Sequence, residues 1–186
     1  MTADAKVKHV VLVGLPGVGK STVGRGVAAR LKRGFIDLDI HIERSFGKTV
    51  SKIFEEDGEA VFRKAEAETS AAVAGMAPSV IAPGGGWVLN SEATAHLLGA
   101  GRIIYLRVAP ETAVRRMGRG IRRRPLLFKS GDPYEAMRAI YDARKAAYEG
   151  CSEMTVETGN TARSNVIATV VELVLSAERD FENGND

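Results

Sequence analysis

Gly14-Leu15-Pro16-Gly17-Val18-Gly19-Lys20-Ser21 decides the fold of this chain, because it has the composition and spacing of a phosphate-binding P-loop. It follows the apolar run Val10–Val13 and precedes a helical pattern, which is the strand, loop and helix context that the motif requires. In such a loop the backbone N–H groups wrap the phosphates of a nucleoside triphosphate, and the helix N-terminus adds the positive end of its dipole. An ordinary glycine-rich turn is the alternative, and the flanking strand and helix argue against it.

The P-loop predicts ATP and Mg²⁺ as ligands. We expect Lys20 to reach the β- and γ-phosphates and Ser21 to offer its hydroxyl to Mg²⁺. The residues expected to bind the nucleotide in this segment are Gly14, Gly17, Val18, Gly19, Lys20, Ser21 and Thr22.

Length and composition indicate one domain over residues 1–186, since 186 residues with 45% hydrophobic content can bury one full core. The net charge of +3 suits an anionic ligand and falls short of a dedicated nucleic-acid binder. Cys151 is the only cysteine, which excludes an intramolecular disulfide and a cysteine-rich zinc site and is typical of a reducing compartment. The polar start, Met1–Lys8, is not a signal peptide, and no apolar run approaches a membrane span. We therefore expect a soluble, cytoplasmic protein.

Five strand-like runs separated by helical patterns predict an α/β fold. Strands that alternate with helices form a mainly parallel sheet with helices on both faces, here a three-layer α/β/α domain with a five-stranded sheet. The expected strands are His9–Val13, Gly34–Leu38, Ser79–Ala82, Arg102–Val108 and Glu153–Glu157.

The helical segments are predicted from apolar periodicity. After the P-loop, Val23, Val27 and Leu31 recur every four residues, and Gly24 permits a close approach to the sheet. The segment Thr49–Met76 is expected to be mostly helical, with Phe62, Thr69 and Val73 on its inner face. Two further helices are expected at Asp132–Tyr148 and Thr161–Arg179, followed by a frayed tail over residues 180–186.

Functional residues should lie in the loops after the strands, because open α/β sheets bind ligands beyond the carboxyl ends of their strands. Asp37 and Asp39 end the second strand two residues apart, so we expect both carboxylates on the same side. Such a pair can supply an acid near Mg²⁺ and a group that deprotonates or orients the attacking alcohol. The alternative is a solvated strand end with turn-forming aspartates.

Two further features admit a structural and a functional interpretation. Arg63 and Glu66 lie three residues apart on a helix, and this spacing alone favours a surface ion pair over a bidentate contact between Arg63 and a substrate carboxylate. The triple glycine Gly84–Gly86 removes every side chain from one loop, so that a ligand can lie against backbone N–H groups, unless the loop is simply flexible. Trp87 follows and either walls the site or, more commonly for tryptophan, packs in the core.

An arginine cluster follows the helix after the fourth strand, and its glycines and arginines together favour a mobile lid over residues 117–131 that closes on ATP. A solvated surface comes second and a nucleic-acid patch third, because few aromatic side chains are nearby to stack on bases. The cluster comprises Arg115, Arg116, Arg119, Arg122, Arg123 and Arg124.

Together these motifs resemble the shikimate kinase family, small members of the nucleoside-monophosphate-kinase-like P-loop group. The resemblance runs from Val10 to Glu157. It rests on Gly14–Ser21, Asp37-Leu38-Asp39, Phe62-Arg63 with Glu66, Gly84–Gly86, Arg124-Pro125-Leu126-Leu127, and Arg144 with Tyr148.

The resemblance implies an acceptor site. Asp39 would hold and orient the shikimate hydroxyls, Arg63 and Arg144 would grip the carboxylate, and Gly84, Gly85 and Gly86 would line the site. The surface interpretation of Arg63 then becomes the minor one, and Glu66 would support that arginine.

It also implies the nucleotide side. Arg124 would be the lid arginine that reaches both the substrate and the γ-phosphate, Arg116 would stack on adenine, and Asp37 would organise Mg²⁺ through water. The catalytic residues would be Lys20, Asp39 and Arg124.

The implied reaction is transfer of the ATP γ-phosphoryl group to the 3-hydroxyl of shikimate, in aromatic amino-acid biosynthesis. We also expect a monomer that binds neither nucleic acid nor membrane. The chain departs from the family pattern at Trp87, at Pro83 and in a lid about one residue longer. The alternatives are a related kinase for another hydroxy acid such as gluconate, and a non-catalytic module that binds nucleotide or nucleic acid.

Overall fold

A five-stranded, fully parallel sheet forms the centre of the computed structural model, which describes residues 8–123, 127 and 131–183. The strand order is β2-β3-β1-β4-β5, and every neighbouring pair is parallel. This confirms the fold class predicted from the sequence. The strands are β1 (His9–Val13), β2 (Gly34–Asp37), β3 (Ser79–Ala82), β4 (Gly101–Arg107) and β5 (Met154–Glu157).

The central strand β1 is buried along its whole length. It pairs with β3 on one side, where Val10 faces Val80, and with β4 on the other, where Val10 faces Arg102. A strand with neighbours on both edges and helices on both faces has no solvent side, which explains its unbroken apolar run Val10–Val13. The P-loop therefore starts from a strand that is buried and paired on both edges.

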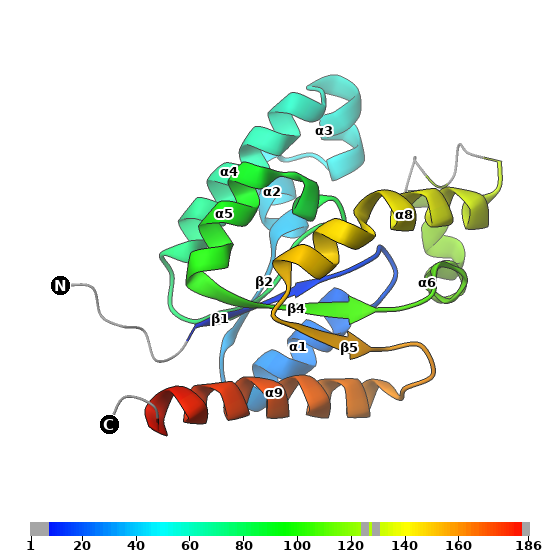
Figure 1. Ribbon diagram of the computed structural model, residues 1–186. Coiled ribbons are helices and arrows are strands. Elements are labelled where there is room, and N and C mark those ends of the chain that lie inside the picture. The colour runs from blue at the N-terminus through cyan, green and yellow to red at the C-terminus, as the bar shows by residue number, and fades with distance from the viewer. Residues whose placement is uncertain (1–7, 124–126, 128–130, 184–186) are drawn as a thin grey trace.

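Helices cover both faces of the sheet (Figure 1), with α1 and α9 on one face and α4, α5 and α8 on the other. The helices are α1 (Lys20–Leu31), α2 (Leu38–Phe46), α3 (Val50–Glu56), α4 (Glu59–Ala74), α5 (Ser91–Ala100), α6 (Pro110–Met117), α8 (Pro133–Cys151) and α9 (Arg163–Asn183), with short 3₁₀ turns η1 (Trp87–Leu89) and η2 (Gly118–Arg123).

Helix α1 lies against the sheet as its periodicity predicts. Val23 and Val27 are buried, and Leu31 packs at the edge of the core. A Cβ atom on Gly24 would lie 2.5 Å from the Phe35 ring, so only glycine permits this separation between helix and sheet.

The segment Thr49–Met76 is mostly helical, as predicted, and it forms two helices. The chain forms α3 and α4, separated at Asp57 and Gly58, where Gly58 has φ +91° and precedes the first turn of α4. Phe62 and Val73 are buried as predicted, whereas Thr69 is only half-buried. Glu66 and Ser70 occupy the buried face instead, because each finds a hydrogen-bond partner there.

Helices α2 and α5 were not specified by the apolar pattern, and both begin at a side-chain cap. The Asp37 carboxylate accepts from the Ile40 N–H, so β2 ends one residue before the predicted Leu38. The Asn90 side chain accepts from the Ala93 N–H at the start of α5. Both caps lie beside the site described next.

Candidate active site

One cavity of about 640 Å³ lies beyond the carboxyl ends of the strands, within the range of small-molecule sites. Its walls come from the P-loop, from the start of α2, from the loop after β3 and from the loop after β5. It is lined by Gly17, Val18, Gly19, Lys20, Ser21, Thr22, Val23, Asp37, Asp39, Ile40, Ala82, Pro83, Gly84, Gly85, Arg116, Thr158, Thr161, Arg163 and Val166.

The P-loop glycines are required by backbone geometry. Gly17 has φ +84°, and a Cβ there would lie 2.6 Å from the Ala113 carbonyl oxygen of α6. Gly19 has φ +104° and caps α1 directly. L-residues with a side chain rarely adopt such φ values, so these positions hold the loop in the shape that exposes its N–H groups.

Lys20 and Ser21 lie at the start of α1, inside the cavity. The Lys20 ammonium donates to the carbonyl oxygens of Gly14 at 2.8 Å and Leu15 at 3.2 Å. The Ser21 hydroxyl donates to the Asp37 carboxylate at 2.7 Å. A hydroxyl and a carboxylate are thus held side by side next to the phosphate-binding loop.

The structure brings Asp37 and Asp39 together for a different reason from the strand alternation expected from the sequence. Asp37 ends β2 and caps α2, whereas Asp39 lies in the first turn of α2, so strand alternation does not place them together. They nevertheless line the same cavity, because the chain turns from strand into helix between them. The helix N-terminus favours a carboxylate at this point.

The triple glycine joins three parts of the site. A Cβ on Gly84 would lie 2.7 Å from a carboxylate oxygen of Asp39, and a Cβ on Gly86 would lie 3.0 Å from the Arg63 guanidinium. A Cβ on Gly85 would lie 2.9 Å from Cδ of Pro16 in the P-loop. The loop is therefore packed, not flexible, and each glycine admits a different neighbour.

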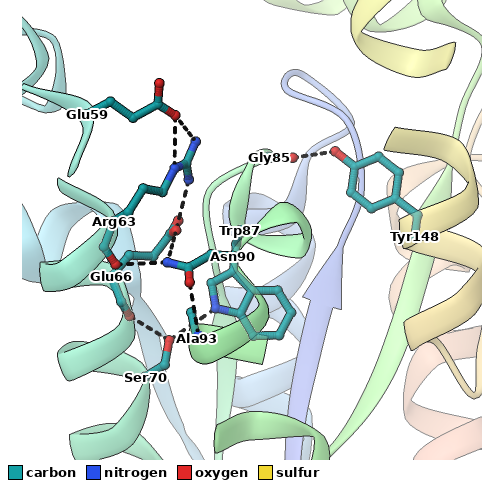
Figure 2. Close-up of polar contacts among 9 residues, drawn as sticks. All are labelled: Glu59, Arg63, Glu66, Ser70, Gly85, Trp87, Asn90, Ala93 and Tyr148. Atoms are coloured by element: carbon teal, nitrogen blue, oxygen red, sulfur yellow. Dashed lines mark hydrogen bonds and ion pairs between the residues drawn. The ribbon is translucent and has the colours of Figure 1, made fainter. Parts of the chain in front are cut away.

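Arg63 is held on α4 by a buried carboxylate. Its guanidinium donates to Glu66 at 2.9 Å and to Glu59 at 3.1 Å (Figure 2), and the Glu66 side chain is only 2% exposed. Burial alone would lower the pKa of Arg63, but the hydrogen bonds and charges of Glu66 and Glu59 outweigh it and raise that pKa. Arg63 is therefore a fixed cation beside Gly86, and its predicted ion pair with Glu66 is largely buried on the carboxylate side.

Asn90 and Trp87 extend this network into the core. The Asn90 amide donates to the Arg63 carbonyl at 2.8 Å and to Glu66 at 3.0 Å, and the Trp87 indole N–H donates to Ser70 at 3.1 Å. Trp87 is fully buried and does not line the cavity, which settles its two interpretations in favour of core packing. The residue that follows the glycine loop is therefore anchored in the core.

Helix α8 reaches the glycine loop through Tyr148, whose hydroxyl donates to the Gly85 carbonyl at 2.5 Å. Arg144 is half-buried one turn earlier, close enough for its charge to act on the Tyr148 hydroxyl. Arg144, Arg63, Gly86 and Gly14 are not among the lining residues. The lid arginine, Arg124, lies outside the described residues.

Sequence reasoning missed the wall contributed by Thr158 and Thr161 of the β5–α9 loop and by Arg163 at the start of α9. Arg116 lies against it, donating to the Val18 carbonyl at 3.4 Å and to the Thr158 hydroxyl at 3.1 Å. Only its position in the chain could have predicted this wall, since this loop, like the others, follows the carboxyl end of a strand.

Within the described residues, no group of three or more His, Cys, Asp or Glu side chains can hold a metal ion. A magnesium ion held mainly by phosphates and water needs no such cluster. None of the described helices has the length and hydrophobicity of a membrane span.

The model of the family described as shikimate kinase matches residues 16–175. The chain belongs to the shikimate kinase family. A shikimate kinase of Symbiobacterium thermophilum is 41% identical over 165 residues, which are 88% of this chain and 94% of the relative. One of Thermobifida fusca is 44% identical over 148 residues, which are 80% and 84% of the two chains.

A solved structure agrees with this assignment. Shikimate kinase from Acinetobacter baumannii in complex with shikimate matches at TM-score 0.86 and 33% identity, covering 91% of this chain and 94% of that one. The chain is thus an ATP-dependent kinase of the shikimate kinase family.

Proposed function

We propose that this kinase transfers the γ-phosphoryl group of ATP to the 3-hydroxyl of shikimate, giving shikimate 3-phosphate and ADP. The single observation that carries the proposal is the shared cavity, where the P-loop meets Asp39 and the glycine loop. The Acinetobacter baumannii relative, solved in complex with shikimate, supports the choice of acceptor.

The nucleotide half is formed by the P-loop and Arg116. The loop N–H groups and Lys20 would bind the phosphates, and the planar Arg116 guanidinium would stack on adenine. Ser21 and Asp37 would hold Mg²⁺, the hydroxyl directly and the carboxylate through water, and their oxygens are the hard ligands that this ion prefers. When bound, the ion neutralises charge on the β- and γ-phosphates.

The acceptor half is formed by Arg63, Arg144, the glycine loop and Asp39. The two arginines would bind the carboxylate of the acid, and the loop would line the site with backbone N–H groups. Asp39 would orient the 3-hydroxyl. Arg63 is already oriented by Glu66 and Glu59, so little conformational entropy is lost on binding.

The transfer itself requires positioning more than covalent catalysis. The 3-hydroxyl oxygen forms a bond to the γ-phosphorus while the bond from that phosphorus to the β,γ-bridging oxygen breaks, and the hydroxyl proton leaves to Asp39 or to solvent. Because the transition state is loose, late proton removal suffices, and Asp39 acts chiefly by orientation. We assign Arg124 to the lid, where it would neutralise charge on the transferring group.

A coupled assay of ADP release tests the proposal with shikimate, gluconate and common nucleoside monophosphates as acceptors. We expect turnover with shikimate only. Asp39→Asn should abolish it, and Arg124→Ala should lower turnover far more than it weakens nucleotide binding. Equal inactivity with every acceptor, together with RNA or DNA affinity that falls steeply with salt, would favour a binding module instead.

A further inference from the structure

Tyr148 makes a hydrogen bond to the glycine loop across 63 positions of sequence. It lies on α8, is fully buried, and its hydroxyl donates to the Gly85 carbonyl at 2.5 Å (Figure 2). Its ring stacks on Tyr105 of β4, with centroids 5.1 Å apart and planes at 18°. The hydroxyl is therefore carried by a ring whose position is set by the sheet.

The bond constrains a whole peptide plane. Because the peptide group is planar and trans, a fixed Gly85 carbonyl also fixes the direction of the Gly86 N–H, which points away from Tyr148. Glycine backbone is otherwise the most permissive in the chain. The Tyr148 hydroxyl thus restricts the loop at the glycines, where the backbone itself is least restricted.

The hydroxyl keeps its proton throughout the physiological range. Burial raises the pKa of Tyr148 to about 12, although the charge of Arg144 acts in the opposite direction. The group is therefore a hydrogen-bond donor to Gly85 and does not exchange protons with a substrate at neutral pH.

The restrained peptide lies between both halves of the site. A Cβ on Gly85 would meet Pro16 of the P-loop, and Cβ atoms on the neighbouring glycines would meet Asp39 and Arg63. A rotation of this peptide would change the approach of Gly86 to Arg63. The Tyr148 hydroxyl donates to the glycine loop itself, at the Gly85 carbonyl.

We propose that Tyr148 is a positioning residue for the acceptor: its hydroxyl holds the Gly85–Gly86 peptide in the orientation that receives the carboxylate end of the acid. This inference rests on the proposed function. Tyr148 acts through the glycine loop and takes no part in the phosphoryl transfer.

Two single-atom variants test the proposal. Tyr148→Phe keeps the stacked ring and removes the hydroxyl. Tyr105→Phe is the matched control, because it also removes a buried tyrosine hydroxyl, but one that has no hydrogen-bond partner in the part of the chain that the structure describes. We expect Tyr148→Phe to raise the KM for shikimate roughly tenfold, with the KM for ATP unchanged, because one hydrogen bond between neutral groups is lost. Tyr105→Phe should change neither KM.

The outcomes separate this inference from the proposed function. Failure of the wild-type chain to phosphorylate shikimate overturns the proposed function. If the wild type is active, an unchanged KM for shikimate in Tyr148→Phe overturns the positioning role. A fall in kcat with both KM values unchanged marks a loss of folded enzyme and also overturns it. Calorimetric titration of shikimate into both folded variants should reproduce the affinity loss for Tyr148→Phe alone.

Discussion

Gly85→Ala should push the glycine loop away from the P-loop and so move the two halves of the active site apart. Gly85 has no positive φ, so alanine can adopt its backbone conformation, and the consequence of the substitution is purely steric. The new Cβ would lie 2.9 Å from Cδ, 3.0 Å from Cγ and 3.3 Å from the backbone nitrogen of Pro16. The proline ring and the P-loop backbone are stiff, so the glycine loop must move away.

The size of the effect follows from these distances. Unstrained carbon contacts lie at about 3.5–4.0 Å, so the loop must retreat by roughly 0.5–1 Å. Over-packing of this kind costs about 1–3 kcal/mol, offset by about 0.4–1 kcal/mol from the smaller entropy of the unfolded chain. We expect a net destabilisation of about 1–2 kcal/mol. A misplacement of about 1 Å at a reacting centre lowers the rate about 100-fold.

Steady-state kinetics with ATP and shikimate, together with urea unfolding, measure both effects. Gly99→Ala is the matched control, because this glycine lies within α5 and a Cβ there meets nothing within 4 Å. It should stabilise the chain by about 0.4–1 kcal/mol and leave the kinetics unchanged. If Gly85→Ala retained kcat within threefold, contact between the glycine loop and the P-loop would not set the geometry of transfer.

Two further predictions concern Tyr148 and Asn90. Burial raises the pKa of Tyr148 from 10.0 to about 12, so its contribution to stability is complete below pH 10 and is lost as the pH rises through 12. Between those values the wild type should lose about 2 kcal/mol more unfolding free energy in urea than Tyr148→Phe, and equal losses would contradict the shift. Asn90→Ser keeps a cap on α5 but removes the amide bonds to Glu66 and to the Arg63 carbonyl, so the KM for shikimate should rise; Asn90→Asp, which places a second carboxylate beside Glu66, should raise it further. Wild-type KM values in both variants would show that this network does not position Arg63.

The phosphate-binding part of the nucleotide half could be predicted from the sequence because its residues are contiguous. The motif Gly14–Ser21 carries both its backbone requirements and its side chains within eight positions, and the strand before it and the helix after it are local patterns as well. The parallel sheet followed from five short apolar runs. These features depend on interactions between near neighbours, which sequence patterns record.

The acceptor half was harder to predict from the sequence because its contacts join segments that are far apart in the chain. The pairing of Arg63 with Glu66 was predicted, but the hydrogen bond that Glu66 accepts from Asn90, 24 positions further along the chain, was not. The aspartate pair was found for a wrong reason, since Asp39 belongs to a helix that begins at Asp37. Local spacing reveals which groups can meet, and only packing determines whether water separates them.

By itself, the sequence determined the phosphate-binding loop, the parallel sheet and, through its resemblance to a known family, the class of reaction. The tertiary structure decided that Trp87 is buried in the core, that Pro16 leaves no room for a Cβ on Gly85, and that the Tyr148 hydroxyl donates to Gly85. The physical reason is the separation in sequence between the residues that interact. Backbone conformation and apolar periodicity are set by neighbours in the chain, whereas the burial of a ring, a carboxylate or a hydroxyl is set by segments that meet only after folding.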